Sequence, residues 1–337
     1  MTAHILPLIW GFLIAFAVLA YVVLDGFDLG CGILFAVERD EQDRNVMVNT
    51  VAPVWDGNET WLVLGGGGLF AVFPLAYAVV MPALYPVIIA MLLSLVFRGV
   101  AFEFRFRATT GWGRACWDFA FFGGSTVAAL CQGLALGGLL QGIRVQNFQY
   151  AGGWWDWLTP FTLVCGIAVV AGYALLGAAW LVWRTEGDLQ ARARRQAGVL
   201  GAATLIMIVV VSAWTPFLPG GYAARWLGWP QVLATGLVPI AVAVLALLFW
   251  RALLGGAHIT PFLCALGWFV LSFVGLGISV YPYIVPPGIT LWDAAAPPAS
   301  QAFLLVGASV LIPLILAYNA FAYWIFRGKV TAGMHYH

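Results

Sequence analysis

The chain has 337 residues, of which 63% are hydrophobic and only 9% are charged, and its formal net charge is +1. Soluble globular proteins carry roughly 25% charged residues, so the composition excludes that class, and the balanced charge indicates no nucleic-acid partner. Since a spanning helix needs about 20 apolar residues, nine helices leave only short loops and tails. The sequence therefore predicts an all-α polytopic membrane protein with a single membrane domain over residues 1–337.

Apolar runs bounded by charges or by Pro and Gly clusters mark nine predicted spans. Runs of this length are too long for strands and predict helices. In chain order they cover residues 8–36, 54–75, 77–98, 117–141, 158–183, 198–217, 229–251, 260–284 and 299–326. The N-terminus has neither a basic region nor a small-residue cleavage site, so we expect the first span to remain as a helix.

The basic residues fall almost entirely in alternate loops. With an extracytoplasmic N-terminus, only Arg144 and Arg225 of the 15 Lys and Arg residues lie outside. This is the positive-inside pattern, and it predicts a cytoplasmic C-terminus. The basic edge at Arg98, Arg105 and Arg107 is expected to contact lipid headgroups, although Arg98 could instead pair with a buried acid. The loops predicted outside carry an interfacial aromatic belt: Trp154, Trp155, Trp157, Trp226 and Trp229.

The histidines and cysteines indicate no cofactor or metal site in this chain. His4 precedes the first predicted span, His258 lies in the short loop 252–259, and His335 and His337 belong to the C-terminal tail. A haem buried between helices would need a ligand inside a span, so we expect no haem held by a histidine pair. The five cysteines show no CxxC spacing and predict neither a zinc site nor a disulfide framework.

Four acids in or beside predicted spans are the strongest candidates for chemistry. Asp25 and Asp28 fall in the first span, and Asp56 and Glu59 open the second. Both pairs have i, i+3 spacing, which places each pair on one face of a helix. Acids are costly inside a membrane and usually face a protein interior or a wet cavity, where they can relay protons. The pattern favours a proton route open to the cytoplasm.

Each of these signals also has a structural interpretation. Asp56 and Glu59 could complement a helix N-terminus, while Asp25 and Asp28 could pair with an arginine or with backbone amides. The surrounding glycines, among them Gly30 and the run 65–68, fit close helix packing. They also fit an interrupted helix of a transporter, so a proton-coupled secondary transporter remains an alternative, and a purely structural scaffold is a third.

The same segments resemble subunit II of the cytochrome bd-type quinol oxidases. The resemblance rests on DGFDLGCGIL, NTVAPVWDGNETWL, SLVFRGVAFEFR, WDFAFFGGS, YPYIVPP and LWDAAAPPASQAF, which follow one another in this order. It extends over nearly the whole chain and is most specific in the first hundred residues. The segment DEQDRNVMVNTVAPVWDGNETW looks most like the cyanide-insensitive branch.

The resemblance implies a fold, a partner and an activity. The fold is two four-helix bundles plus one peripheral helix. The partner in a heterodimer is subunit I, which carries haems b558, b595 and d (or a b-type haem in place of d) and the quinol site, and a small single-helix accessory subunit is a further candidate. The complex in the bacterial cytoplasmic membrane oxidises quinol and reduces dioxygen to water, and it is electrogenic without pumping protons.

The resemblance also assigns residues and roles within this haem-free subunit. Asp56 is the first choice for a cytoplasmic proton path, with Asp25 and Asp28 near its mouth. Support for assembly and haem retention in subunit I is a second role. The chain departs from the family pattern at Val54, where some longer relatives have a His in the proton path, so that Glu59 or a water would take the place of that His. The loop 218–228 is also shorter than in the long-form relatives. Three further residues of the motif are expected to line or pack the path: Trp55, Asn58 and Trp61.

Overall fold

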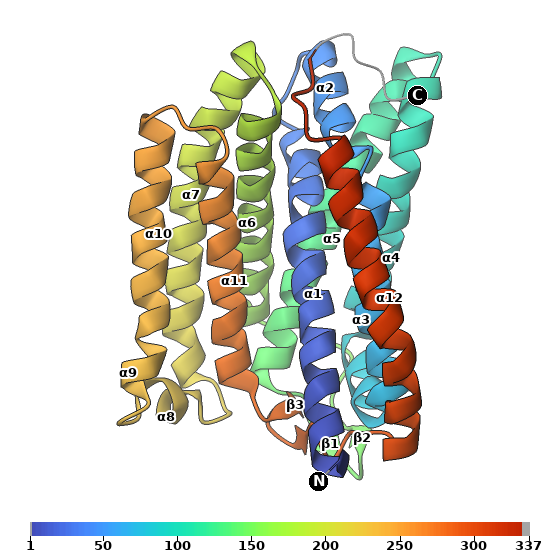
Figure 1. Cartoon of the computed structure of the whole chain (residues 1–337), viewed down its shortest axis with the longest axis vertical. Helices are drawn as coiled ribbons and strands as arrows, with labels where there is room; N and C mark the ends of the chain where they lie inside the picture. Colours follow the sequence, from blue (N-terminus) through green and yellow to red (C-terminus); the bar gives the residue numbers. More distant parts are fainter. Residues whose placement is uncertain (1, 332–337) are drawn as a thin grey trace.

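The apolar segments fold as long helices that run side by side along one axis, as Figure 1 shows. A computed structural model describes residues 2–331. The helices are α1 (Thr2–Leu34), α2 (Glu41–Val51), α3 (Trp55–Val72), α4 (Pro74–Arg107), α5 (Gly111–Gln141), α6 (Pro160–Arg184), α7 (Gly187–Trp214), α8 (Tyr222–Leu227), α9 (Val232–Thr235), α10 (Leu237–Leu254), α11 (Thr260–Val280) and α12 (Pro298–Ile325), with a 3₁₀ turn at Thr215–Phe217.

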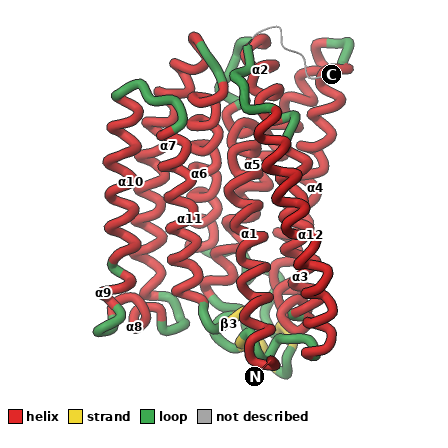
Figure 2. The backbone as a smooth tube through the Cα atoms, viewed as in Figure 1, coloured by secondary structure: helices red, strands yellow, loops and turns green. Residues whose placement is uncertain are grey.

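Two short antiparallel hairpins lie at the end of the molecule that carries the N-terminus (Figure 2). One pairs β1 (Val145–Gln146) with β2 (Gln149–Tyr150), and the other pairs β3 (Tyr283–Val285) with β4 (Ile289–Thr290). We call this end the hairpin end. The opposite end, which carries α2 and residues 326–331, is the α2 end.

The helices gather into two four-helix bundles and one peripheral helix, which confirms the predicted fold class. Helices α1, α3, α4 and α5 form one bundle, and α6, α7, α10 and α11 form the other. The bundles join where α1 and α5 pack against α6. Helix α12 lies along α1 and α3, and most of its apolar residues are exposed, although Ala308 and Ile312 are buried.

Eight helical segments are long and apolar enough to cross a membrane. The predicted span that is not among these eight, residues 54–75, corresponds to α3. Helix α3 has 18 residues, and its polar first turns and four consecutive glycines lower its hydropathy. Among residues 2–331 the helices are thus compatible with the nine predicted spans. Both α1 and α3 are continuous, so the interrupted helix on which the transporter alternative rested is absent from these two segments.

Several helix ends differ from the prediction because helical hydrogen bonding continues beyond the apolar run. Helix α4 extends to Arg107, so Arg98 lies inside the helix and not at its end. Helix α7 begins at Gly187 and includes the basic turns before residue 198. Helix α1 begins at Thr2, which places His4 in its first turn and not before the span. His335 and His337 lie outside the described residues.

Helix α2 is the longest element that the hydropathy pattern did not predict. Its sequence EQDRNVMVNTV is polar in its first half, and its last six residues are buried. Asp40 caps its N-terminus by accepting a hydrogen bond from the amide of Asp43. A capped amphipathic helix of 11 residues is too short and too polar to be predicted as a membrane span, so the segment was assigned to a loop.

Glycines bring α1 and α6 into direct backbone contact at the centre of the molecule. A Cβ atom placed on Gly30 would lie 1.9 Å from the carbonyl oxygen of Tyr173, and one on Gly177 would lie 2.3 Å from the carbonyl carbon of Gly30. Only glycine permits this approach, as in small-residue interfaces between membrane helices. The contact seats the acid-bearing part of α1 against the second bundle.

Candidate functional site

Two acids of α1 lie in the interior of the protein. Asp25 and Asp28 are both 0% exposed, and their i, i+3 spacing places them on one face of the helix. This face meets α3 and α4, which supply the polar partners described below. A membrane-embedded acid with this degree of burial needs specific partners to offset the loss of hydration.

Arg98 of α4 supplies a buried positive charge to this cluster. Its Nη1 atom lies 2.6 Å from Oδ1 of Asp25, and its Nη2 atom lies 3.2 Å from Oε2 of Glu59 on α3. The guanidinium also lies over the rings of Trp55 and Phe102, at 5.8 and 6.0 Å from their centroids, a favourable cation–π arrangement. The pairing of Arg98 with a buried acid was one of the sequence expectations, and it is confirmed.

Asn58 of α3 connects Asp28 to the peripheral helix. Its Nδ2 donates to Oδ2 of Asp28 at 2.7 Å and to the carbonyl of Leu24 at 3.3 Å. The hydroxyl of Tyr323 on α12 donates to Oδ1 of Asn58 at 2.8 Å. A chain of hydrogen bonds therefore runs from α12 through α3 to the buried acid of α1.

Asp56 occupies a different position from the other three acids. It is exposed and lines a groove of about 410 Å³ between α3 and α12, together with Gly57, Thr60, Leu314, Ile315, Tyr318 and Asn319. A small recess beside the groove is bounded by Asn58, Asn319 and Tyr323 among others. The sequence analysis placed Asp25 and Asp28 near the mouth of a proton path that uses Asp56, and their order along such a path stays a prediction. In this chain helix packing encloses Asp25 and Asp28 and leaves Asp56 exposed.

The two tryptophans of the second motif serve as packing residues. Trp55 stacks on Phe102 with ring centroids 5.0 Å apart and so covers Arg98. Trp61 is fully buried and meets Phe16 edge-on at 5.6 Å. Within residues 2–331 neither side chain hydrogen-bonds to the acids, so Trp55 acts on the cluster by covering it and Trp61 by packing beside α1.

The sequence reasoning missed several polar residues of the site. Tyr323 and Asn319 come from the last long helix, and Tyr21, Gln132 and Tyr173 form a second buried chain next to Asp25. In that chain the Tyr173 hydroxyl donates to Gln132, and Gln132 Nε2 donates to the Tyr21 hydroxyl at 2.8 Å. The only available signal was the presence of polar side chains inside apolar runs, which is typical of functional or interhelical contacts.

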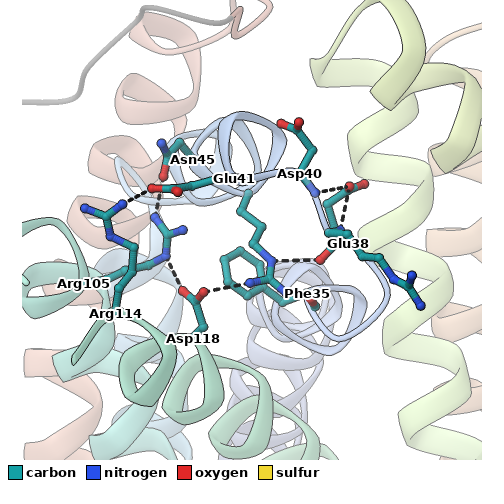
Figure 3. Close-up of polar contacts among 10 residues, drawn as sticks. Phe35, Glu38, Asp40, Glu41, Asn45, Arg105, Arg114 and Asp118 are labelled. Carbon is teal, nitrogen blue, oxygen red and sulfur yellow. Dashed lines mark hydrogen bonds and ion pairs between the residues drawn. The ribbon is translucent and has the colours of Figure 1, made fainter. Parts of the chain in front are cut away.

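A second charged network closes the α2 end of the same bundle (Figure 3). Asp118 of α5 accepts from Arg105 Nε at 2.6 Å and from Arg44 Nη1 at 2.8 Å. Arg44 also donates to the carbonyl of Glu38, and Arg105 to Asn45. The sequence analysis assigned Arg105 to a basic edge that contacts lipid headgroups. Instead, these residues fasten α2 to α4 and α5.

The histidines of the described chain do not fit a buried haem. His4 is exposed in the first turn of α1 at the hairpin end, whereas His258 lies in the loop between α10 and α11 and contacts Gln190 Nε2 through Nδ1. The two rings therefore cannot share one haem. Within residues 2–331, no group of three or more His, Cys, Asp or Glu side chains is arranged to hold a metal ion.

Comparison with known proteins gives a consistent result along the chain. The family model described as "Cytochrome bd terminal oxidase subunit II" matches residues 6–326. The Escherichia coli K12 protein named "Cytochrome bd-I ubiquinol oxidase subunit 2" is 32% identical over 97% of this chain and 96% of its own. A Bacillus subtilis protein named "Cytochrome bd ubiquinol oxidase subunit 2" is 26% identical over 96% of each chain.

The fold is also similar to that of a solved structure. A chain of the bd oxidase from Geobacillus thermodenitrificans superposes with a TM-score of 0.77, covering 96% of this chain and 99% of that one at 16% identity. At this identity the likeness concerns the arrangement of helices alone.

Proposed function

Because this chain belongs to the cytochrome bd terminal oxidase subunit II family, we propose that it is the haem-free second subunit of an oxidase that couples quinol oxidation to the reduction of dioxygen to water. The names of its relatives support quinol as the electron donor. The segment 40–61 favours the cyanide-insensitive branch of the family. The chain has no activity alone, and the complex generates a membrane potential without pumping protons.

The role of this chain within the complex is to conduct protons and to hold its partner. Reduction of dioxygen to water consumes protons, and buried acids linked to a surface groove can deliver them. Asp56 exchanges protons with water in the groove, and Asp28 and Asp25 form the inner end of the path, with Glu59 beside them. The observation that carries this proposal is the hydrogen-bonded chain Tyr323–Asn58–Asp28, which borders the recess next to the groove.

The partner is subunit I, which would supply haems b558, b595 and d, or a b-type haem in place of d, together with the quinol site. When bound there, the haems carry electrons to dioxygen. This chain contributes helix surfaces that support assembly and haem retention. An exposed carboxylate such as Asp56 is unfavourable against lipid tails, so its groove is best accommodated where protein or water covers it. A single-helix accessory subunit and membrane lipids complete the expected surroundings.

The complex lies in the bacterial cytoplasmic membrane, and we propose that the α2 end faces the cytoplasm. The basic residues favour this orientation, because only Arg144 and Arg225 belong to the loops of the hairpin end. The N-terminus is then extracytoplasmic and the C-terminus cytoplasmic. Protons enter the groove of Asp56 from the cytoplasmic side.

Purification of the tagged chain from its native membranes tests this proposal. We expect a haem-bearing partner to copurify and the sample to consume oxygen with quinol, with resistance to cyanide if the branch assignment is right. A dithionite-reduced minus oxidised spectrum identifies the haems. A partnerless, haem-free chain from a preparation that keeps other respiratory complexes intact would contradict the oxidase. Substrate uptake by the chain alone in vesicles would favour the transporter.

A further inference from the structure

The buried acid cluster contains more negative groups than its positive charge can balance. Asp25, Asp28 and Glu59 provide three carboxyl groups, and Arg98 provides the guanidinium that pairs with them. If all three acids were ionised, the cluster would carry a net charge of −2 in the interior of a membrane protein. A buried charge without a counter-ion is strongly unfavourable, and such a group takes up a proton instead.

The contacts distinguish the three acids from one another. Asp25 pairs with Arg98 at 2.6 Å, and the side chains of both are 0% exposed. Glu59 receives the second guanidinium nitrogen at 3.2 Å, and 25% of its side chain is exposed, so solvent can stabilise its charge. Asp28 has neither advantage. It is fully buried and is not paired with a cation among the described residues. One buried oxygen of each aspartate, Oδ2 of Asp25 and Oδ1 of Asp28, has no hydrogen-bond partner within residues 2–331, so the missing cation is what sets Asp28 apart.

The surroundings of Asp28 add negative rather than positive charge. On its own helix lie Asp25 and Cys31, and from α3 come Glu59 and the neutral amide of Asn58. Helix α12 contributes the hydroxyl of Tyr323, and α4 contributes Arg98, which Asp25 and Glu59 already share. Two neighbouring carboxyl groups therefore oppose a third negative charge at Asp28, as in carboxyl pairs that share one proton.

We propose that Asp28 holds a proton in the resting enzyme and is the position at which this chain stores a proton taken from the groove. Asn58 and Tyr323 are the positioning residues: Tyr323 fixes the amide of Asn58, whose Nδ2 donates to the carbonyl oxygen of the protonated acid. Loading transfers a proton from a hydronium ion in the groove to Asp28 and leaves a water molecule. The storage role rests on the proposed function, whereas the bound proton follows from the charge balance.

A polar group at the groove supports this direction of entry. Nδ2 of Asn319 is buried and has no hydrogen-bond partner in the part of the chain that the structure describes, although the residue lines both the groove of Asp56 and the recess beside Asn58 and Tyr323. A buried amide donor normally has an acceptor, and ordered water commonly provides it. A water molecule held by Asn319 would stand between the surface acid and the hydrogen-bonded chain that ends at Asp28.

Infrared spectroscopy of the complete purified oxidase tests the protonation state directly. Aspartate labelled with ¹³C at its side-chain carboxyl shifts the carbonyl band of every protonated aspartic acid, so the difference between labelled and unlabelled samples isolates these bands. We expect Asp28→Asn to remove one band. The matched variant Asp25→Asn should retain it. Tyr323→Phe should move it to higher frequency, because Asn58 loses its donor and binds Asp28 less firmly.

The alternative results would overturn the proposal. An unchanged band set in Asp28→Asn means that Asp28 is ionised, and loss of a band in Asp25→Asn alone places the proton on the other acid. If Asp28→Asn fails to assemble, the Tyr323→Phe spectrum decides, since an unmoved band contradicts the assignment. Failure of the proposed proton path would give a different result. In that case the Asp28 band would be present, while Asp56→Asn would keep full turnover.

Discussion

At the scale of single residues, the position of Asp56 at the groove determines what its removal should do. Asp56→Asn keeps the size of the side chain and disturbs no buried contact, so the complex should assemble with its full haem content. Its quinol oxidase turnover should fall at least several-fold, because a carboxamide does not ionise and so cannot take up and release a proton as a carboxylate does. Oxygen consumption per haem measures the effect. Glu103→Gln is the matched control, since within residues 2–331 Glu103 pairs only with exposed Arg107 on α4, and its turnover should be unchanged.

Arg98 is buried, and in contrast to Asp56 the removal of its charge should destabilise the protein. Arg98→Gln leaves Asp25 buried without its cation, and removal of one partner of a buried pair costs about 3–5 kcal/mol. The variant should unfold at lower temperature and copurify with less haem. Arg107→Gln removes an exposed arginine from the same helix, 72% exposed against 0% for Arg98, and should change the unfolding free energy by less than about 1 kcal/mol. Equal stability of the two variants would contradict the buried pair.

The turn after β4 provides a pH-dependent contact outside the membrane-spanning helices. The hydroxyl and the amide of Thr290 both donate to Oδ2 of Asp293, and these bonds hold the pKa of Asp293 below its ordinary value. The contact therefore stabilises the turn above the unfolded pKa, and this contribution is lost as the pH falls through the lower, folded pKa. Amide exchange at Thr290 should accelerate in this window relative to neighbouring amides. In Asp293→Asn this pH-dependent difference should vanish.

Residue-level reasoning found the acids and missed their partners on α12. Acids inside apolar spans are visible in any sequence because of their cost in a membrane. Tyr323 is separated from Asn58 by 265 positions, and no local spacing connects the two. The relative burial of Asp56 and Asp28 was also invisible, since both follow the same i, i+3 pattern with a second acid.

At the scale of elements, the contact between α1 and α6 predicts that the effect of a Gly→Ala substitution on stability depends strongly on which glycine is replaced. Gly30→Ala places a Cβ atom 1.9 Å from a backbone carbonyl oxygen of α6, so the two bundles must separate. Overpacking of this kind costs roughly 1–3 kcal/mol or more. Thermal unfolding should occur at lower temperature, with loss of assembled oxidase. Gly66→Ala is the control, because its Cβ atom would meet nothing within 4 Å, and it should be as stable as the wild type.

Helix α2 demonstrates how charge pairs can create an element that hydropathy overlooks. Its Arg44 shares Asp118 with Arg105 of α4, while Arg192 of α7 binds both Glu38 and Asp43. The segment 38–51 is thus fastened to both bundles. These contacts join residues far apart in the sequence, so only the assembled bundles provide the partners that hold the helix in place.

At the scale of the whole molecule, the distribution of cysteines offers a test of orientation. Cys116 is exposed at the α2 end of α5, whereas the other four cysteines are buried. A membrane-impermeant maleimide should label it in inside-out vesicles and not in intact spheroplasts. Cys116→Ser should abolish the labelling. Adding Gln149→Cys in the first hairpin to this variant should restore labelling, now from the outside only. The reverse pattern would contradict a cytoplasmic α2 end.

The amino-acid sequence was sufficient to predict the membrane class, the nine apolar segments, the two-bundle fold through family resemblance, and the candidate acids. These features depend on hydropathy, on helical spacing and on short motifs, all of which are local. Four features emerged from the packing of the helices: Asp28 is enclosed without a cation among residues 2–331, Asp56 faces a groove, Arg98 pairs with two acids, and α12 reaches the site through Tyr323. The reason is physical: burial and pairing arise where helices distant in sequence pack together, and no segment contains that information alone.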